Sequence, residues 1–260
     1  MFVVVMWAAV PAFAQLPSPY KLSWETDASI CLPGAAGVLG GYVAERSVQP
    51  LTAQEIGQLS RSSVNGFDRS ATYLYSTTAN TVSDVVYGAA AIAPFILFAD
   101  ESMRKDWQTI SVMYGETMEW FGAATMIAKG TVQRIRPYVY NPNVSMDEKY
   151  SLEAQESFFS AHSTIAFASA VFVSTVYSEY YPDSKWKPYI WTGSLLAASA
   201  VGYLRYAAGQ HYPSDILVGA IVGSAIGYTI PWLHKTHFDN TKVDMGMYDG
   251  TPCISVTVKF

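Results

Sequence analysis

Apolar residues gather in five long stretches in the C-terminal two thirds of the chain. The stretches run over residues 82–98, 110–128, 163–177, 189–204 and 216–233. Each is close to the roughly 20 residues with which a helix crosses a bilayer, and two carry acids, Asp84 in one and Glu116 in another. The pattern predicts an all-α helical bundle of five, or with a weaker patch six, membrane-spanning helices. A soluble bundle with buried central helices is the alternative.

The N-terminal segment differs from the rest of the chain. Residues 1–14 form an almost unbroken apolar run that closes on Ala12-Phe13-Ala14, the small-x-small pattern of a secretory cleavage site. We therefore expect a signal peptide over 1–14 and an exported N-terminal segment over 15–81. The weaker Gly-rich apolar patch at 31–43 is expected to be peripheral or re-entrant, because a sixth span would place the N-terminus inside and conflict with cleavage.

Basic residues in the connections suggest an orientation. If five helices span, three connections share one side, and their basic residues are Arg104, Lys105, Lys185, Lys187 and Lys235. Lysine and arginine are typical of cytoplasmic loops. We expect the other two connections, 129–162 and 205–215, to face the periplasm from a bacterial inner membrane, with a soluble periplasmic protein as the alternative.

The tail, residues 234–260, has a different pattern. Apolar and polar residues alternate on both sides of Asp249-Gly250, which predicts a short β-hairpin. The two cysteines of the chain, Cys31 and Cys253, lie on opposite sides of the membrane in the five-span arrangement and are not expected to pair.

Composition excludes several classes of protein. The chain is 50% hydrophobic and only 14% charged, whereas a typical soluble domain has about 25% charged residues. The aromatic content of 14% excludes a disordered chain. A net charge of −5 leaves no broad basic surface, so nucleic acid is not an expected partner. Nothing in the sequence sets the oligomeric state.

Two histidines stand at the starts of apolar helices. His162 lies in the segment 160–163 before one helix, and His211 precedes Pro213 and Asp215 at the start of the last helix. The free N–H groups and the dipole of a helix N-terminus favour an anion. Two such termini are expected on the same outward face.

Positive charges fall on that same face. Lys129, Arg134, Arg136 and Arg205 all lie at the ends of apolar stretches. Cations next to buried or intramembrane helix ends are costly unless they meet an anion. A phosphate group would meet that need.

The order and spacing of these residues resemble a known pattern. Lys129 is followed after six residues by Arg136-Pro137, then by Ser160-Ala161-His162, and finally by Arg205, His211 and Asp215 with five and three residues between them. This resembles the type 2 phosphatidic acid phosphatase superfamily, which includes vanadium-dependent haloperoxidases and bacterial acid phosphatases. The resemblance covers about residues 82–233. Phe159, Ala161 and Leu204 stand where the family pattern has Pro, Gly and Ser; Ala161 keeps the backbone N–H donor if its φ is negative.

The resemblance implies a role for each motif residue. His211 would be the nucleophile that forms a phosphohistidine, Asp215 would hold its other ring nitrogen, and His162 would be the general acid and then the base. Lys129, Arg136, Arg205, Ser160 and the N–H of Ala161 would bind the phosphate oxygens. Arg134, outside the motif, would assist at most. No cofactor or metal is implied, and the sequence has neither His-Glu-x-x-His nor Cys-x-x-Cys spacing.

The expected function is hydrolysis of a lipid phosphate monoester or pyrophosphate at the outer face of the inner membrane, with membrane lipid as a partner. Three alternatives remain open: a soluble periplasmic acid phosphatase of broad specificity, a vanadium-dependent haloperoxidase, and a non-catalytic membrane scaffold or transporter.

Overall fold

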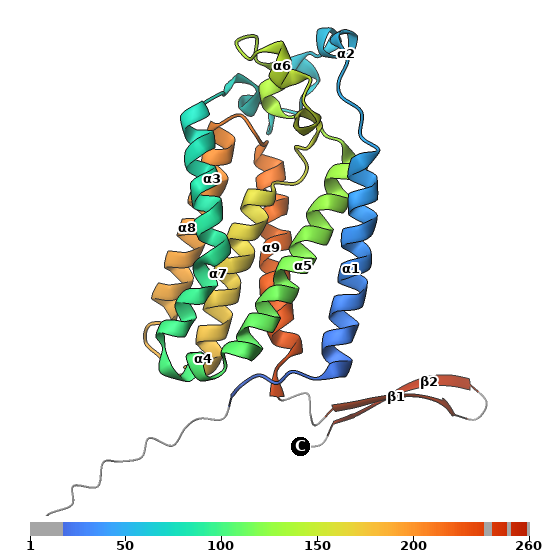
Figure 1. Ribbon diagram of the computed structural model, residues 1–260, viewed down its shortest axis with the longest axis vertical. Helices are drawn as coiled ribbons and strands as arrows, with labels where there is room; N and C mark the ends of the chain where they lie inside the picture. Colours follow the sequence, from blue (N-terminus) through green and yellow to red (C-terminus); the bar gives the residue numbers. More distant parts are fainter. Residues whose placement is uncertain (1–17, 237–240, 249–250, 259–260) are drawn as a thin grey trace, which may run out of the picture.

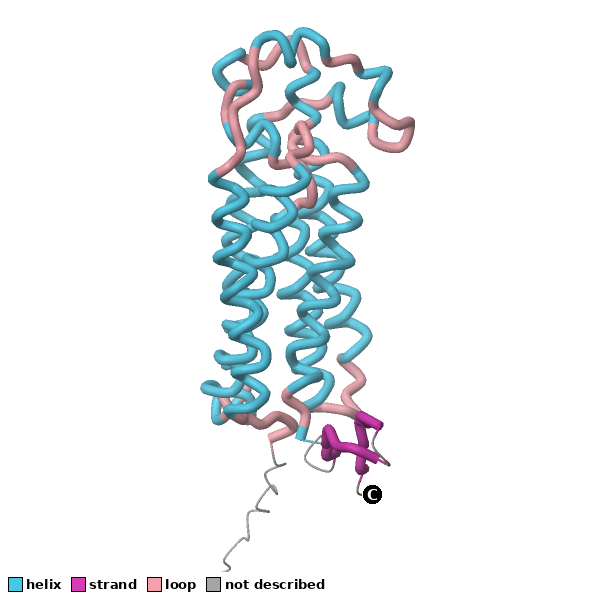
Figure 2. The backbone as a smooth tube through the Cα atoms, turned by 90° about the vertical axis from the view of Figure 1, so that its right-hand side faces the viewer, coloured by secondary structure: helices cyan, strands magenta, loops and turns pink. Residues whose placement is uncertain are grey.

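The computed structural model describes residues 18–236 and, for the backbone alone, 241–248 and 251–258. Within these ranges, six long helices run alternately up and down beside one another and form an elongated bundle (Figures 1 and 2). They are α1 (Trp24–Arg46), α3 (Thr77–Ile92), α5 (Trp107–Val132), α7 (Ala161–Tyr180), α8 (Lys187–Ala207) and α9 (Pro213–Leu233).

The five predicted helices correspond to α3, α5, α7, α8 and α9, and the sequence pattern is confirmed for each. The first predicted helix is shorter than expected, because the chain tightens into the 3-10 helix η3 (Ala93–Ala99) around Pro94. Proline lacks the N–H that would continue the α-helical ladder. A short helix, α4 (Glu101–Lys105), then leads into α5.

The expectation for residues 31–43 is wrong, because they belong to α1, a full-length member of the bundle. Ser23 caps this helix by accepting a hydrogen bond from the N–H of Thr26. The glycines of the patch allow close helix packing rather than a loop. A Cβ added to Gly41 would lie 2.7 Å from the Cβ of Met126, and one added to Gly130 would lie 2.5 Å from the N of Glu45. Small residues bring the backbones of α1 and α5 together.

The bundle has two distinct ends. The upper end carries the small helices α2 (Ala53–Gln58), α6 (Met146–Lys149), η1 (Arg61–Ser63), η2 (Arg69–Tyr73), η4 (Pro137–Tyr140) and η5 (Leu152–Gln155). The lower end holds α4, the first turn of α1 and the last turn of α9 (Figure 1). There Tyr20 forms a β-bridge with Lys235. Both ends of the bundle's chain therefore meet at its lower end.

The sixth long helix changes the expected membrane topology. A bundle of six spanning helices places residue 18 on the same side as the loops of Lys105 and Lys187. Cleavage of a signal peptide would leave residue 18, and with it this end of the bundle, outside the membrane. The connections 129–162 and 205–215 at the other end would then face the cytoplasm. In a bundle of six spanning helices, a cleaved signal peptide is therefore incompatible with a phosphate site that faces outward. The segment 1–14, where a signal peptide is predicted, lies outside the described residues. The separation of Cys31 from Cys253 also loses its basis, since it depended on five spans.

The tail forms two antiparallel strands, β1 (Thr241–Tyr248) and β2 (Thr251–Val258), in register from Thr241 with Val258 to Tyr248 with Thr251. The turn residues Asp249 and Gly250 lie outside the described residues.

Two helical segments of the described chain are long and apolar enough to cross a membrane, residues Thr77–Ala99 and Pro213–Leu233. By themselves, two such segments are weak evidence of a membrane protein.

Candidate active site

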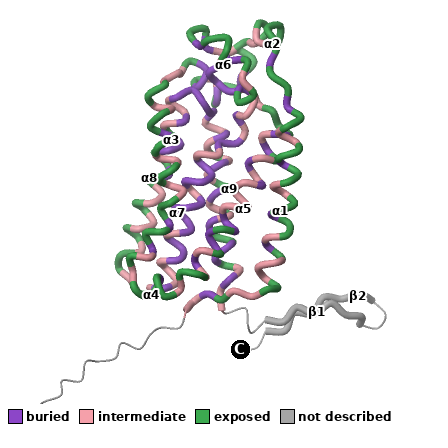
Figure 3. The backbone as a smooth tube through the Cα atoms, viewed as in Figure 1, coloured by how far each residue is buried: buried purple, intermediate pink, exposed green. Residues whose placement is uncertain are grey.

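A polar cavity of about 610 Å³ opens at the upper end of the bundle. Six predicted site residues line it: Lys129, Arg136, Ala161, His162, Arg205 and His211. Figure 3 shows buried segments gathered below α6 at this end. The structure thus brings together residues that are up to 82 positions apart in the sequence, as the motif spacing implied.

The start of α7 supplies one wall. Ser160 caps the helix and accepts a hydrogen bond from the N–H of Ser163 at 3.3 Å. Ala161 and His162 follow in the first turn and line the cavity. Among the described non-glycine residues a positive φ is found at Gln133, not at Ala161. Alanine in place of the family's glycine therefore adds no backbone strain here. Ser160 itself is fully buried and does not line the cavity.

The turn between α8 and α9 supplies the opposite wall. Arg205 lies in the last turn of α8, and His211 precedes Pro213, the first residue of α9. Gly209 has a φ of +70°, a conformation that favours glycine, and lies against the backbone of Leu74. This turn directs Arg205 and His211 into one cavity, although they lie on either side of it.

His211 is held by a backbone carbonyl. Its Nδ1 is 2.7 Å from the carbonyl oxygen of Ser157, whereas the nearest oxygen of Asp215 is 3.8 Å away. The hydrogen bond that the resemblance gives to Asp215 is therefore made by Ser157. Because a carbonyl only accepts, Nδ1 carries the proton and Nε2 keeps its lone pair.

Asp215 supports His211 indirectly, through Ser157. It is fully buried and accepts hydrogen bonds from the hydroxyl of Ser157 at 2.5 Å and from the N–H of Tyr212 at 3.0 Å. It also forms an ion pair with Arg134. Asp215 thus fixes the residue whose carbonyl orients His211.

Arg134 completes this supporting network. It pairs with Asp68 at 2.8 Å, donates to the hydroxyl of Ser214 at 2.8 Å and stacks on the ring of Tyr212 at 4.0 Å. Burial alone would lower the pKa of Arg134, but the two carboxylates raise it overall. Burial would raise the pKa of Asp68, but hydrogen bonds from Asn65, Arg134 and Ser214 lower it. Arg134 and Asp68 are therefore both charged at neutral pH.

His162 is held by a different carboxylate. Its Nε2 is 2.9 Å from Oδ1 of Asp84 on α3, and its ring packs against Tyr87 with the centroids 4.5 Å apart. Asp84 also accepts a hydrogen bond from Arg205 at 3.2 Å. One side chain on α3 thus links a histidine and an arginine of the motif.

The cations of the cavity have partners but also spare donors. Lys129 pairs with Glu156 at 3.1 Å, Arg136 donates to Gln210, and Arg205 donates to Asn80 at 2.7 Å. Nonetheless, the Nε groups of Arg136 and Arg205 are buried without a hydrogen-bond partner. Buried charged donors without acceptors are costly. The chemistry of this set fits an oxyanion such as phosphate.

These charges also act on His211. Burial is the largest effect and the positive charges of Arg136 and Arg205 the next, and together they hold the pKa of His211 well below its ordinary value of 6.5. The imidazole is therefore neutral, the form in which Nε2 can act as a nucleophile.

Several residues of the site were missed in the sequence. The structure adds Asp84, Asn80, Tyr87, Ser157, Glu156 and Gln210. A signal existed for Asp84, an acid inside an apolar stretch, since such acids are functional candidates. Ser157 gave none, because its contribution is a backbone carbonyl.

Part of the chain matches a known protein family. The family model of the PAP2 superfamily matches residues 111–239. A solved structure of a transmembrane PAP2 type phosphatidylglycerolphosphate phosphatase from Bacillus subtilis is 17% identical, with 76% of this chain and 93% of that chain covered and a TM-score of 0.37. No curated protein matches the chain significantly.

Proposed function

Because residues 111–239 match the family model of the PAP2 superfamily, we propose that the upper cavity is the active site of a phosphatase acting on a lipid phosphate monoester or pyrophosphate. The observation that carries the proposal is the convergence of two histidines and three cations on one cavity. Phosphoryl transfer requires this combination: an in-line nucleophile, a proton donor for the leaving group, and positive charge around the equatorial oxygens.

In the first step, Nε2 of His211 attacks phosphorus and forms a P–N bond while the P–O bond to the lipid breaks. The proton remains on Nδ1, and the Ser157 carbonyl that accepts its hydrogen bond disperses the positive charge that forms on the ring. His162 gives its proton to the leaving oxygen, so that the lipid departs as an alcohol, or as a monophosphate if the substrate is a pyrophosphate.

In the second step, the neutral His162 accepts a proton from water, and the resulting hydroxide attacks phosphorus. The P–N bond breaks, inorganic phosphate leaves, and both histidines return to their starting states. Throughout, Lys129, Arg136 and Arg205 bind the phosphoryl oxygens, together with the N–H of Ala161. Asp84 accepts a hydrogen bond from Nε2 of His162 when that nitrogen carries a proton.

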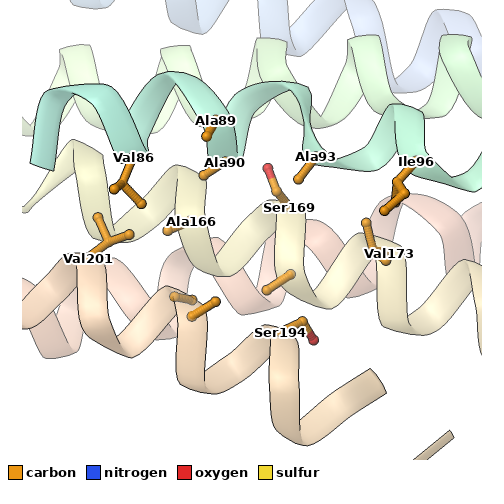
Figure 4. A pocket seen from close by; sticks show the side chains of 13 residues that line it. Val86, Ala89, Ala90, Ala93, Ile96, Ala166, Ser169, Val173, Ser194 and Val201 are labelled. Atoms are coloured by element: carbon orange, nitrogen blue, oxygen red, sulfur yellow. The ribbon is translucent and has the colours of Figure 1, made fainter. Parts of the chain in front are cut away.

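An apolar groove next to the active site supports a lipid substrate. A cavity of about 280 Å³ lies between α3, α7 and α8 and is lined mostly by alanine and valine. Ala166 lies one helical turn below His162, and Val201 lies one turn from Arg205. Figure 4 shows Val86, Ala166 and Val201 at one end of this groove and Ile96 and Val173 at the other. An acyl or prenyl chain fits a groove that begins under the phosphate site.

The surface of the bundle supports a membrane location. Large apolar side chains on the long helices are more than 60% exposed, among them Leu39, Ile92, Leu196 and Ile221. Exposed tryptophans mark the lower end of four helices: Trp24, Trp107, Trp186 and Trp232. Aromatic belts of this kind are typical of membrane–water interfaces. We propose that the bundle spans the membrane, with the lysine-rich lower end inside and the active site at the periplasmic face.

The substrate proposal is tested with a pair of variants on α8. Ala197 is exposed and lines the groove, whereas Ala200 is exposed and does not. We expect Ala197→Phe to lower kcat/KM for phosphatidate in mixed micelles by about 10-fold and to change hydrolysis of p-nitrophenyl phosphate by less than about twofold, with Ala200→Phe neutral on both. Hydrolysis of the soluble ester alone by the unmodified protein would indicate an acid phosphatase of broad specificity. No phosphate release from either substrate would refute the phosphatase.

The topology is tested separately in a protein without Cys31 and Cys253. Single cysteines replace Asn143 and Lys105, which are exposed at opposite ends of the bundle. A membrane-impermeant maleimide should label Asn143→Cys in intact spheroplasts and Lys105→Cys only after lysis. The reverse result would place the active site in the cytoplasm. Labelling of both, with release by carbonate, would indicate a soluble exported bundle.

A further inference from the structure

Three side chains with metal-binding atoms meet at the lower end of the bundle, remote from the active site. Asp27 lies in the first turn of α1, Glu116 lies in α5, and His234 follows the last residue of α9. Their ligand atoms all lie within 4.8 Å of one another. Glu116 and His234 are each 2% exposed, whereas the side chain of Asp27 is 26% exposed and forms the solvent-facing side of the cluster.

The hydrogen bonds of His234 fix its tautomer and leave Nε2 facing the two carboxylates. Its Nδ1 is 2.9 Å from the carbonyl oxygen of Ile230, so Nδ1 carries a proton. The other nitrogen, Nε2, faces Oδ1 of Asp27 at 3.1 Å and Oε2 of Glu116 at 3.3 Å. A neutral ring would therefore direct its lone pair at two carboxylates, so a proton or a metal ion must lie between them.

A proton on Nε2 does not satisfy both carboxylates. The single N–H can serve Asp27, and the buried Oε2 of Glu116 is then left without a hydrogen-bond partner. The other oxygen of Glu116 accepts from the thiol of Cys31 at 3.6 Å, which aims Oε2 into the cluster. A divalent ion would contact Nε2 and both carboxylates at once.

The spacing fits such an ion. In tetrahedral zinc sites, bonds of about 2.0–2.1 Å to N and O place neighbouring ligand atoms about 3.3 Å apart. The two separations that involve His234, 3.1 and 3.3 Å, match that value, and the two carboxylate oxygens lie within 4.8 Å of each other. A carbonyl that fixes the tautomer of a ligating histidine is also the usual outer support of zinc sites. We propose that Asp27, Glu116 and His234 form a divalent metal site of the zinc type that fastens α1 and α5 to the end of α9.

The test uses the full-length protein in detergent, with an affinity tag free of histidine. After EDTA treatment and removal of the chelator, Zn²⁺ is added, excess is removed, and metal is counted by mass spectrometry. We expect about one zinc per chain and a Tm higher by about 5 °C. Glu116→Gln and His234→Gln should lose the metal and the Tm shift. The matched controls Glu119→Gln, one turn along α5, and His162→Gln, at the upper end, should keep both.

Folding and function are checked independently. Asp27→Asn is the milder variant if His234→Gln does not fold, and hydrolysis of a soluble phosphate ester, unchanged within about threefold, reports a folded upper end. Less than about 0.1 zinc per chain, or equal zinc in the unmodified protein and Glu116→Gln, would overturn the metal site in favour of a proton shared among the three side chains. Neither result affects the proposed phosphatase, whose residues lie at the upper end of the bundle.

Discussion

At the upper end of the bundle, His162 and His211 face a cavity whose most buried charges are the guanidinium groups of Arg136 and Arg205, whereas at the lower end His234 faces two carboxylates. Histidine is common to both ends, and in both a backbone carbonyl fixes Nδ1 as the protonated nitrogen. The surrounding charge differs in sign. The comparison teaches that the neighbours of an imidazole decide whether its free nitrogen meets an anion or a cation.

The two ends also differ in openness. The upper cavity admits a phosphate ester, and the acids that line it, such as Asp84 and Glu153, are exposed. The lower cluster is packed between α1, α5 and α9, with Glu116 and His234 each 2% exposed. We therefore expect chemistry at the upper end and stabilisation at the lower end.

The strongest test substitutes the same residue type at each end. His211→Gln removes the proposed nucleophile and should lower kcat for a soluble ester by about 10⁴-fold, while His234→Gln should change it by less than about threefold. Acid-labile, alkali-stable phosphate trapped on His211 in the unmodified protein would support the covalent step. Near-normal activity of His211→Gln, confirmed as folded by circular dichroism, would refute the nucleophile.

A second test adds an anion that should bind the upper cavity and, separately, a chelator that removes metal cations. Vanadate copies the trigonal-bipyramidal transition state and should inhibit competitively, with an inhibition constant about 100-fold below the KM of a soluble ester. EDTA should leave the rate within about twofold, because the proposed reaction uses the cations of the protein. Loss of activity in EDTA with recovery on adding a divalent metal would contradict the mechanism.

A third test concerns the support of His211. Arg134→Lys keeps the positive charge but loses the planar fork that joins Asp215, Asp68 and Ser214. We expect kcat to fall by about 10-fold with little change in KM, because Arg134 does not line the cavity. A rise in KM alone would instead indicate a direct role in substrate binding. Arg69→Lys, at the first residue of η2, is the matched control and should be neutral.

The smallest effect concerns pH. Since burial and two guanidinium groups lower the pKa of His211 well below 6.5, the neutral imidazole should persist as the pH falls from 8 to 5.5. Histidine-labelled protein should show a ring signal that is absent in His211→Gln and that moves by less than about a tenth of the shift of a free imidazole over this range. An inflection near pH 6.5 would show that the cations do not act on His211.

The helices and many of the cavity residues could be predicted from the sequence, because apolar stretches and motif spacings are patterns among residues that are close in the sequence. Runs of apolar residues predicted α3, α5, α7, α8 and α9, and the motifs predicted six residues that line the cavity. Asp84 and Glu116 were visible as acids within apolar stretches, yet nothing in the sequence indicated what each contacts.

The sequence by itself determined the five helices, the family pattern and the anionic character of the expected ligand, because helix formation and helix-end charge are set within a few residues of each position. Only the tertiary structure decided that the glycines of 31–43 belong to a sixth helix, that Ser157 rather than Asp215 bonds to His211, and that Asp27 and His234 meet. Asp27 and His234 are 207 positions apart. Contacts over such separations depend on which helix faces pack together, and that choice is made by the whole bundle.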